Sequence, residues 1–492
     1  MTQTLIQQLA DFAADTRFEN LPHEVVHECK RVILDSIGCA VAGVDEPKSR
    51  IAIQYARMVG AGDPKATLFG TAEKVSVLGA AFANAELINA LDMDAVLPPG
   101  HVSPYVMPAA FATAETLRGS GREMVVAMAV SHEMSNRFGK AVDYQRRVRD
   151  GKIDPPKVFG YSNTIFGATA AIGRLRGQSR ETLAHALGIA AAISPVNSQI
   201  AWFEHVPIST IKYQLAGMLA QQALTASTMG ELGHRGDLQV LDDREYGYAR
   251  FIGTEKWDPA ELTAQLGSRW NFPRESAYKP YPHCRIMHAM FDLIIDIVRE
   301  QQLKPAEIEA MKVYVEGIAE RPCWVNRTIE RVEDAQFSMA HGIAVAAHDW
   351  PPGRAWQDPK NVHSESVMSL MQRVTTQVHP DYAKAITGNA AARPARVEIR
   401  ARGQTFVGEK NYPKGSPSPD PASLMTDEEL TSKFSHNCAG VLADAQIRAL
   451  TEAVWNLDSV EDFGAVMRLC SPGAAAARTQ APQTALQTAG AK

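Results

Sequence analysis

The stretch with the most chemical potential carries two carboxylates, Asp92 and Asp94, followed by the imidazole of His101. The carboxylates come two residues apart at the end of a run of small residues, and a Pro-Pro-Gly loop separates them from the histidine. Because proline and glycine restrict the loop, its ionisable groups can be held in place. Such a set suits proton transfer in a cleft. The alternative is a solvated turn between helices, in which the aspartates cap backbone amides.

Two lysines occur where a substrate carboxylate could be bound. Lys212 starts an alanine-rich helix that is otherwise uncharged for several turns. There it is either a fixed cation near the positive end of the helix or a surface group whose aliphatic stem lies along the protein. Lys279 begins the segment Lys-Pro-Tyr-Pro-His-Cys-Arg, which also contains His283. Its two prolines stiffen the backbone, as a binding site requires.

Two further positions have both a functional and a structural interpretation. Ser162 precedes a helix of small residues, so its hydroxyl either faces a ligand or caps that helix. His341 follows Phe337-Ser338 in an apolar helical context. A histidine in that position is either a satisfied core residue or a group that transfers protons.

The spacings typical of metal and phosphate sites are missing from the sequence. It contains no HExxH, EF-hand, Walker or GxGxxG motif, and no GxSxG elbow for acyl transfer. We therefore expect neither a metal nor another cofactor. The remaining Asp, His and Lys groups suit the abstraction or delivery of a proton next to a carboxylate, with lysines offsetting the negative charge that develops.

Composition limits the class of protein. The chain has 492 residues, of which 45% are hydrophobic and 21% charged, with a formal net charge of −5. No extended basic block favours nucleic acid, and no apolar run reaches the roughly 18 residues of a membrane span. Six scattered cysteines without a CxxC pair argue against a disulfide framework. We expect a globular, cytoplasmic protein with a large core.

The elements that must position these groups change character along the chain. Alanine-rich helical runs dominate the first half, whereas Lys312–Glu316 and the hairpin Arg396–Gly408 alternate as strands do. The fold class expected is mostly α, with a large all-α domain and a smaller α+β lid domain. The boundaries expected are 1–270 for the helical domain, 271–412 for the lid, 413–472 for helices that return to the helical domain, and 473–492 for a disordered tail.

Several segments, taken in order and spacing, resemble the MmgE/PrpD family over about residues 4–470. They are Leu34–Gly43, the Leu91–Asp94 turn with His101 and Ser103, Glu133–Gly139, Lys212 with its helix, the Lys279 segment, Phe337-Ser338 and Thr426–Phe434. The resemblance implies a helical domain, a lid domain and a homodimer with the site in the cleft between domains. Known members include 2-methylcitrate dehydratases, cis-aconitate decarboxylases and iminodisuccinate epimerases, which act on small polycarboxylates without a metal.

The resemblance also assigns positions. Asp92, His101, Lys212 and Lys279 would lie in the pocket, with Asp94 close by. The departures from the family pattern include Ala95-Val96 after the second aspartate, a serine at 162 where a histidine is usual and a histidine at 341 where a tyrosine is usual. These exchanges suggest altered chemistry or an altered substrate.

The leading hypothesis is a metal-independent lyase, a dehydratase or a decarboxylase, acting on a small di- or tricarboxylate. In it His101 is the general acid or base, Asp92 orients it or shares its proton traffic, and His341 is a second proton-transfer group. Substrate binding is assigned to Lys212, Lys279, Asp94, Ser162 and His283. One alternative is an epimerase or isomerase with His101 and His341 as opposed bases, and another is a catalytically inactive carboxylate-binding protein.

Overall fold

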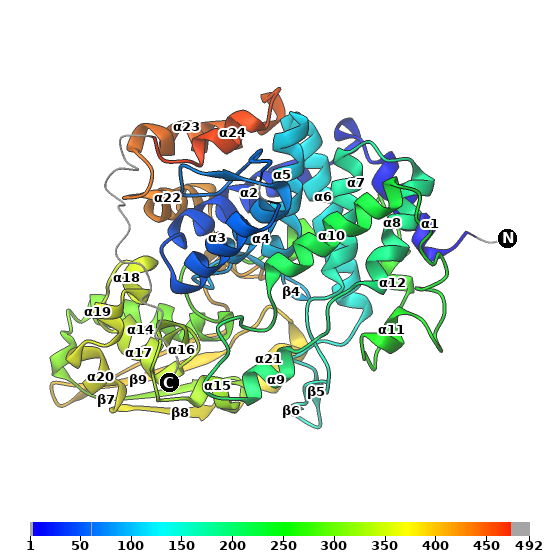
Figure 1. Ribbon diagram of the computed structural model, residues 1–492. Helices are drawn as coiled ribbons and strands as arrows, with labels where there is room; N and C mark the ends of the chain where they lie inside the picture. Colours follow the sequence, from blue (N-terminus) through cyan, green and yellow to red (C-terminus); the bar gives the residue numbers. More distant parts are fainter. Residues whose placement is uncertain (1–2, 61, 474–492) are drawn as a thin grey trace, which may run out of the picture.

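The computed structural model describes residues 3–60 and 62–473 (Figure 1). The disorder predicted for 473–492 falls outside this range, apart from Gly473. Within the described ranges, no helix is both long and apolar enough to cross a membrane. All six cysteines are free thiols, as their spacing predicted.

The predicted mostly α fold is confirmed. Long helices of the first half pack against one another, α4 on α5, α6 on α7 and α10 on α4, α7 and α8. The longer helices of this part are α1 (Leu5–Asp15), α2 (His23–Ala42), α3 (Pro47–Met58), α4 (Val77–Ile88), α5 (Ser103–Leu117), α6 (Gly121–Ala141), α7 (Thr164–Leu175), α8 (Arg180–Ala192) and α10 (Ala216–Glu231). The shorter ones are α9 (Gln199–Glu204), α11 (Tyr248–Phe251), α12 (Ala260–Thr263) and α13 (Phe272–Glu275).

Local sequence explains where these helices begin and how closely they approach. The hydroxyl of Ser76 accepts a hydrogen bond from the amide of Gly79 and so caps α4. A Cβ on Gly79 would lie 2.5 Å from the carbonyl oxygen of Ala56 in α3. The small residues of the sequence therefore allow helix backbones to come into contact, as the alanine- and glycine-rich runs predicted.

The second part of the chain is built on a four-stranded sheet of order β10-β9-β7-β8. Its strands are β7 (Ile308–Val315), β8 (Val374–Val378), β9 (Ala395–Ala401) and β10 (Gln404–Lys410). The helices of this part are α14 (His288–Glu300), α15 (Pro322–Val325), α16 (Val332–Ala335), α17 (Met339–Ala346), α18 (Arg354–Gln357), α19 (Pro359–Val362), α20 (Glu365–Met371) and α21 (Tyr382–Gly388). The predicted strand and hairpin correspond to β7 and to the antiparallel pair β9–β10.

Three two-stranded ribbons connect the helices of the first part. They are β1 (Ala66–Thr67) with β2 (Lys74–Val75), β3 (Val96–Leu97) with β4 (Gly100–His101), and β5 (Val148–Arg149) with β6 (Lys152–Ile153). The ribbon β3–β4 carries His101.

The last three helices, α22 (Asp427–Cys438), α23 (Asp444–Trp455) and α24 (Gly464–Leu469), lie beside the helices of the first part (Figure 1). Helix α22 packs on α2, where a Cβ on Gly38 would lie 2.9 Å from the ring of Phe434. The threonine at 426 caps α22 in a capping box with Glu429. The C-terminal helices thus return to the helical part.

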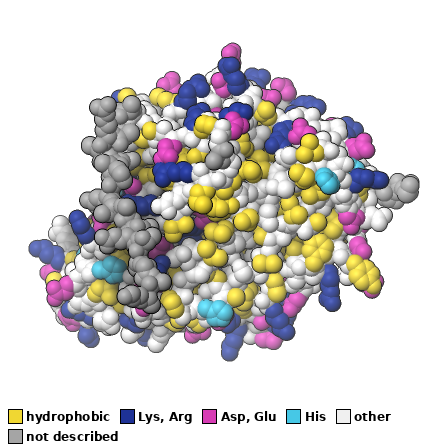
Figure 2. Space-filling view, in the orientation of Figure 1, with side chains coloured by type: hydrophobic (Ala, Val, Ile, Leu, Met, Phe, Trp, Pro, Cys, Tyr) yellow, Lys and Arg dark blue, Asp and Glu magenta, His cyan; other side chains and the backbone are white. Residues whose placement is uncertain are grey.

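The face seen in Figure 2 has basic and acidic side chains interspersed around its edge, with hydrophobic side chains gathered in the middle. In Figure 1, α3, α4 and α10 occupy that middle region. Exposed apolar residues of these helices are Ile51, Met58, Leu78 and Met218. The homodimer expected from the sequence remains a prediction.

Candidate active site

The carboxylate–histidine stretch lines a cavity of about 640 Å³. The first part of the chain contributes Asp92, His101, Tyr161 and Tyr213 to its wall. Residues from positions 277–417 also line the wall, Lys279, Arg285 and Arg393 among them. A cavity of this size holds a small organic molecule, and its lining comes from both parts of the chain.

The turn that carries the aspartates follows α4 and is fixed by its backbone. Asp92 adopts a left-handed conformation with a φ of 51°, and its amide donates to the carbonyl of Asn89 at 3.2 Å. The amide of Ala95 donates to the carboxylate of Asp35 at 2.9 Å. Lys433 of α22 donates to the carbonyl of Met93 at 2.8 Å. Segments distant in sequence therefore support this turn.

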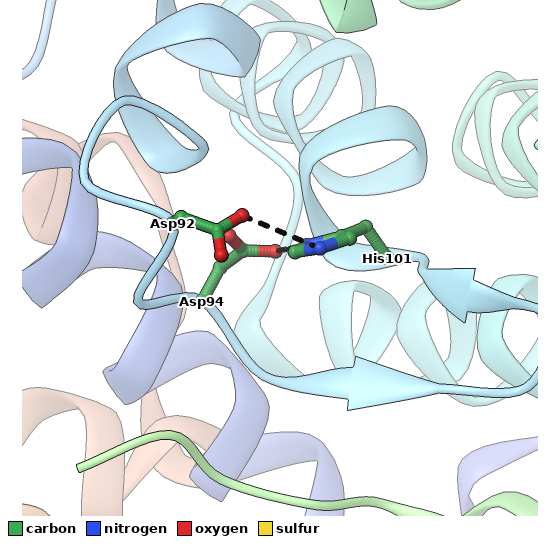
Figure 3. A group of neighbouring side chains, drawn as sticks. All are labelled: Asp92, Asp94 and His101. Carbon is green, nitrogen blue, oxygen red and sulfur yellow. Dashed lines mark hydrogen bonds and ion pairs between the residues drawn. The ribbon is translucent and has the colours of Figure 1, made fainter. Parts of the chain in front are cut away.

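The carboxylates of Asp92 and Asp94 both point toward the ring of His101 (Figure 3). Its Nδ1 is 2.6 Å from Asp94 Oδ2, and its Nε2 is 3.5 Å from Asp92 Oδ1. With the Nδ1 proton donated to Asp94, Nε2 is left to face Asp92 and the cavity. Burial raises the pKa of Asp94, but the contact with His101 outweighs burial and keeps that pKa below its ordinary value. Asp94, rather than Asp92, thus orients the ring, which differs from the prediction.

Two lysines meet the carboxylate of Asp92. Lys279 Nζ is 2.9 Å from Oδ2 and Lys212 Nζ is 3.6 Å from Oδ1. Burial raises the pKa of Asp92, yet Lys279, Lys212 and His101 together lower it well below its ordinary value. Lys279 is brought here by two backbone hydrogen bonds of 2.8 Å between Val96 in β3 and Ala277. Asp92 therefore stays ionised between two ammonium groups.

Lys212 is buried, with only 2% of its surface exposed, so it is not a surface group. It also does not start a helix, because it lies in a turn with a φ of 55° and α10 begins at Ala216. From this turn its ammonium donates to the carbonyl of Asn89. Burial lowers the pKa of Lys212 to about 8, although Asp92 opposes this shift.

Two tyrosines complete this end of the cavity. The ring of Tyr213 stacks on His101 with 5.2 Å between centroids, and its hydroxyl is 3.4 Å from Asp92 Oδ1. Tyr161 contacts both rings edge-on and accepts a hydrogen bond of 2.9 Å from Gln199. Sequence reasoning missed both tyrosines. The available signal was their position directly beside Ser162 and Lys212.

Comparison with known proteins gives the family. The chain matches the MmgE/PrpD N-terminal domain over residues 7–260 and the MmgE/PrpD C-terminal domain over residues 281–458. It belongs to the MmgE/PrpD family. The resemblance seen in the sequence is thereby confirmed.

Its curated relatives in this family are distant but align over nearly their whole length. A cis-aconitate decarboxylase of Aspergillus terreus is 23% identical, and the alignment covers 94% of this chain and 95% of the relative. The cis-aconitate decarboxylase of Homo sapiens is also 23% identical, with 95% of each chain covered. A cis-aconitate decarboxylase-like protein, oryM, of Aspergillus oryzae is 23% identical over 94% of this chain and 96% of its own.

Five of the predicted site residues lie outside the cavity lining. Asp94 and Lys212 still contact the lining residues His101 and Asp92, whereas three others are held by different groups. The Ser162 hydroxyl donates to the carbonyl of Pro195 and is 2.5 Å from Asn197, so backbone and amide groups satisfy it. The His341 ring is fully buried in α17 and donates from Nε2 to the carbonyl of Val362 at 2.9 Å. Contacts with other protein groups therefore explain the positions of both side chains without a substrate.

His283 is the third of these residues. Its ring is fully buried against Phe291 and Trp356, at 5.2 and 5.4 Å between centroids. Neither ring nitrogen has a hydrogen-bond partner among the described residues. Burial lowers the pKa of His283 to about 3, so this neutral ring belongs to the core. The structure thus unites Asp92, Asp94, His101, Lys212 and Lys279, and separates from them Ser162, His283 and His341.

Asp92, Asp94 and His101 also have the residue types of a metal site, since their ligand atoms lie within 4.8 Å of one another. A divalent cation here would stand beside two ammonium groups, because Lys279 and Lys212 already contact Asp92. Like charges at such distances repel strongly in a buried site. The carboxylate of Asp92 is therefore already paired with two cations of the protein.

Proposed function

We propose that the chain is a metal-independent lyase, a decarboxylase or a dehydratase, that acts on a small di- or tricarboxylate by proton transfer next to a carboxylate. Family membership and the cis-aconitate decarboxylases among its relatives support a lyase of this type. The observation that carries the proposal is the convergence of the buried imidazole of His101 and the buried ammonium of Lys279 on one cavity, with the ammonium of Lys212 behind them against Asp92.

The charge of the cavity wall supports an anionic substrate. Three carboxylates line it: Asp92, Glu261 and Glu275. Against them stand seven cations: Lys140, Arg146, Lys256, Arg274, Lys279, Arg285 and Arg393. An excess of positive charge in a concave site attracts and holds negatively charged molecules.

The arrangement divides the chemistry among named groups. A substrate carboxylate placed beside Lys279 and Lys212 receives charge-assisted hydrogen bonds, each contributing about 1.5–3 kcal/mol. Loss of carbon dioxide, or of a proton from the neighbouring carbon, leaves negative charge that these ammonium groups offset. His101, held by Asp94, delivers or removes the proton through Nε2. Asp92 holds both lysines in place.

The epimerase alternative has less support. Epimerisation at one carbon uses two bases on opposite faces, and the predicted second base was His341. That ring is buried and bonded to the carbonyl of Val362, away from the cavity wall. A lyase with a single imidazole at the reacting carbon fits the arrangement better.

The test is turnover of a panel of di- and tricarboxylates, cis-aconitate and citrate included, in deuterated water with and without a chelator. We expect mass loss of carbon dioxide or water, unaffected by the chelator and lowered at least a thousandfold in His101→Asn. The matched control, His234→Asn, alters an exposed histidine and should keep full activity.

Other outcomes contradict the proposal in different ways. Deuterium exchange with conserved mass would indicate an epimerase. Ligand-induced thermal stabilisation without any turnover would indicate a carboxylate-binding protein. Activity lost on chelation and restored by one metal would refute metal independence.

A further inference from the structure

A second group of cations lines the same cavity, apart from the aspartate–histidine–lysine cluster. It consists of Arg146, Arg285 and Arg393. Arg285 precedes α14, Arg393 precedes β9, and Arg146 belongs to the loop before β5. Among the described residues, no hydrogen bond or ion pair joins these arginines to Asp92, His101, Lys212 or Lys279.

Arg146 is fully balanced by protein groups. Its guanidinium forms a two-pronged ion pair with Glu316, at 2.7 Å from Nε and 2.5 Å from Nη2. It also donates to the carbonyls of Ala390 and Ala392. With 1% of its surface exposed, it fixes its loop to the sheet-containing part of the chain.

Arg285 is also buried, but no carboxylate of the described residues pairs with it. It is 7% exposed and donates to the carbonyl of Lys414 at 3.0 Å and to the hydroxyl of Ser416. The nearby carboxylate of Asp292 is already engaged by the hydroxyl of Tyr281, the ammonium of Lys410 and the amide of Lys414. Burial, with repulsion from the other two arginines, lowers the pKa of Arg285 to about 9.

Among the described residues, no carboxylate forms a hydrogen bond or ion pair with Arg393. Its Nη1 donates to the carbonyls of Ala390 and Ala392, at 2.9 and 2.8 Å. Its Nε is buried and has no hydrogen-bond partner among the described residues. Burial and the charge of Arg146 lower its pKa. Arg285 is a buried guanidinium without a carboxylate on it, which is costly, and the half-buried Arg393 lines the same wall, so an anion bound between the two would stabilise both charges.

We propose that Arg285 and Arg393 bind a second carboxylate of the substrate, while Lys279 and Lys212 bind the carboxylate next to the reacting carbon. The planar fork of guanidinium donors suits a carboxylate, which it can bind through two parallel hydrogen bonds. This subsite deepens the proposed function and depends on it for the identity of the reacting end. It defines the substrate class as a diacid long enough to reach both groups.

The test is calorimetric binding of succinate, glutarate and adipate, each compared with its monomethyl ester. None of these saturated acids carries a leaving group, so the measurement needs no turnover. For the chain length that binds best, we expect the wild-type protein to bind the diacid at least tenfold more tightly than its half-ester. In Arg285→Gln and Arg393→Gln this preference should fall below about threefold, with half-ester affinity retained.

Matched controls separate binding from structural support. Arg299→Gln changes an arginine that pairs with Asp349 on the surface, and it should keep the full diacid preference. If Arg285→Gln does not fold, Arg285→Lys tests the fork geometry while keeping the charge. Equal weakening of diacid and half-ester would mean that Arg285 only supports the loop at Lys414, and would overturn the proposal.

The wild-type comparison also stands alone, because equal affinity for every diacid and its half-ester refutes the subsite without any variant. Its failure is distinguishable from failure of the proposed function. Turnover without diacid preference refutes only the arginine subsite. Diacid preference without turnover refutes only the lyase.

Discussion

Lys212 is the residue through which pH should act on the site. Its ammonium is buried beside Asp92, and burial brings its pKa down to about 8. Below that pH the group is charged and attracts a carboxylate, whereas above it the charge is lost. We expect the dissociation constant for the best-binding diacid to be constant from pH 6 to 7 and to rise several-fold by pH 9, measured by calorimetry.

A charge-retaining substitution provides the control. The ordinary pKa of arginine lies above 12, so Lys212→Arg should lose most of the weakening between pH 7 and 9, and the small change that remains comes from Arg285, whose pKa burial lowers to about 9. Lys212→Gln should bind weakly throughout. A wild-type affinity that does not change up to pH 9.5 would contradict the assignment of Lys212 to substrate binding.

Residue spacing predicted part of the site, and packing decided the rest. Asp92, Asp94 and His101 are close in sequence, so their convergence followed from one stiff loop. Which aspartate contacts Nδ1 depends on the left-handed turn at Asp92, which spacing does not reveal. His341 lies next to a matching Phe-Ser segment, but a carbonyl from α19 holds its ring, and only the folded chain shows that contact.

At the scale of elements, the ribbon β3–β4 controls the shape of the cavity. Gly100 lies against Tyr161, and an added Cβ would be 2.4 Å from the ring and 2.5 Å from its hydroxyl. The ring is buried and bonded to Gln199, so it can move only by losing that contact. We expect Gly100→Ala to lower stability by about 1–3 kcal/mol and to weaken diacid binding, as measured by denaturant unfolding and calorimetry.

Gly119→Ala is the matched control, because a Cβ there meets nothing nearer than 3.6 Å. Its stability and affinity should stay close to those of the wild type. If Gly100→Ala bound diacids as tightly as the wild type, Tyr161 would not shape the binding site.

The sequence predicted some of the helices and strands but not others. Alternation identified β7 and the hairpin β9–β10, because one side of β7 and of β9 is mostly buried and half-buried residues alternate with exposed ones along β10. The sequence analysis missed β8, the parallel partner of β7. Its five residues pair with a strand about 60 positions earlier, and no turn next to β8 in the sequence indicates this pairing. The start of α10 was also misplaced, because Lys212 adopts a left-handed turn before the helix.

At the scale of the whole molecule, the C-terminal helix α22 holds the turn that carries Asp92 and Asp94. Lys433 donates to Asp35 at 2.6 Å and to the carbonyl of Met93 at 2.8 Å. Removing this ammonium leaves the buried carboxylate of Asp35 and the turn without their shared donor. We expect Lys433→Met to lower kcat at least tenfold in the lyase assay and to lower the thermal unfolding temperature.

Arg448→Met provides the comparison, since Arg448 is exposed on α23 of the same C-terminal segment. It should match the wild type in both measurements. Full activity of Lys433→Met would show that the turn keeps its geometry without α22.

The long reach of Lys433 has a consequence for how the protein is made. A ribosome adds this residue 340 positions after Met93, when the helices around the turn have already been synthesised. Asp92 and Asp94 are therefore synthesised long before Lys433, whose ammonium holds their loop. A nascent chain released before residue 433 should compact and still lack a competent centre, so catalytic competence is acquired only near the end of synthesis.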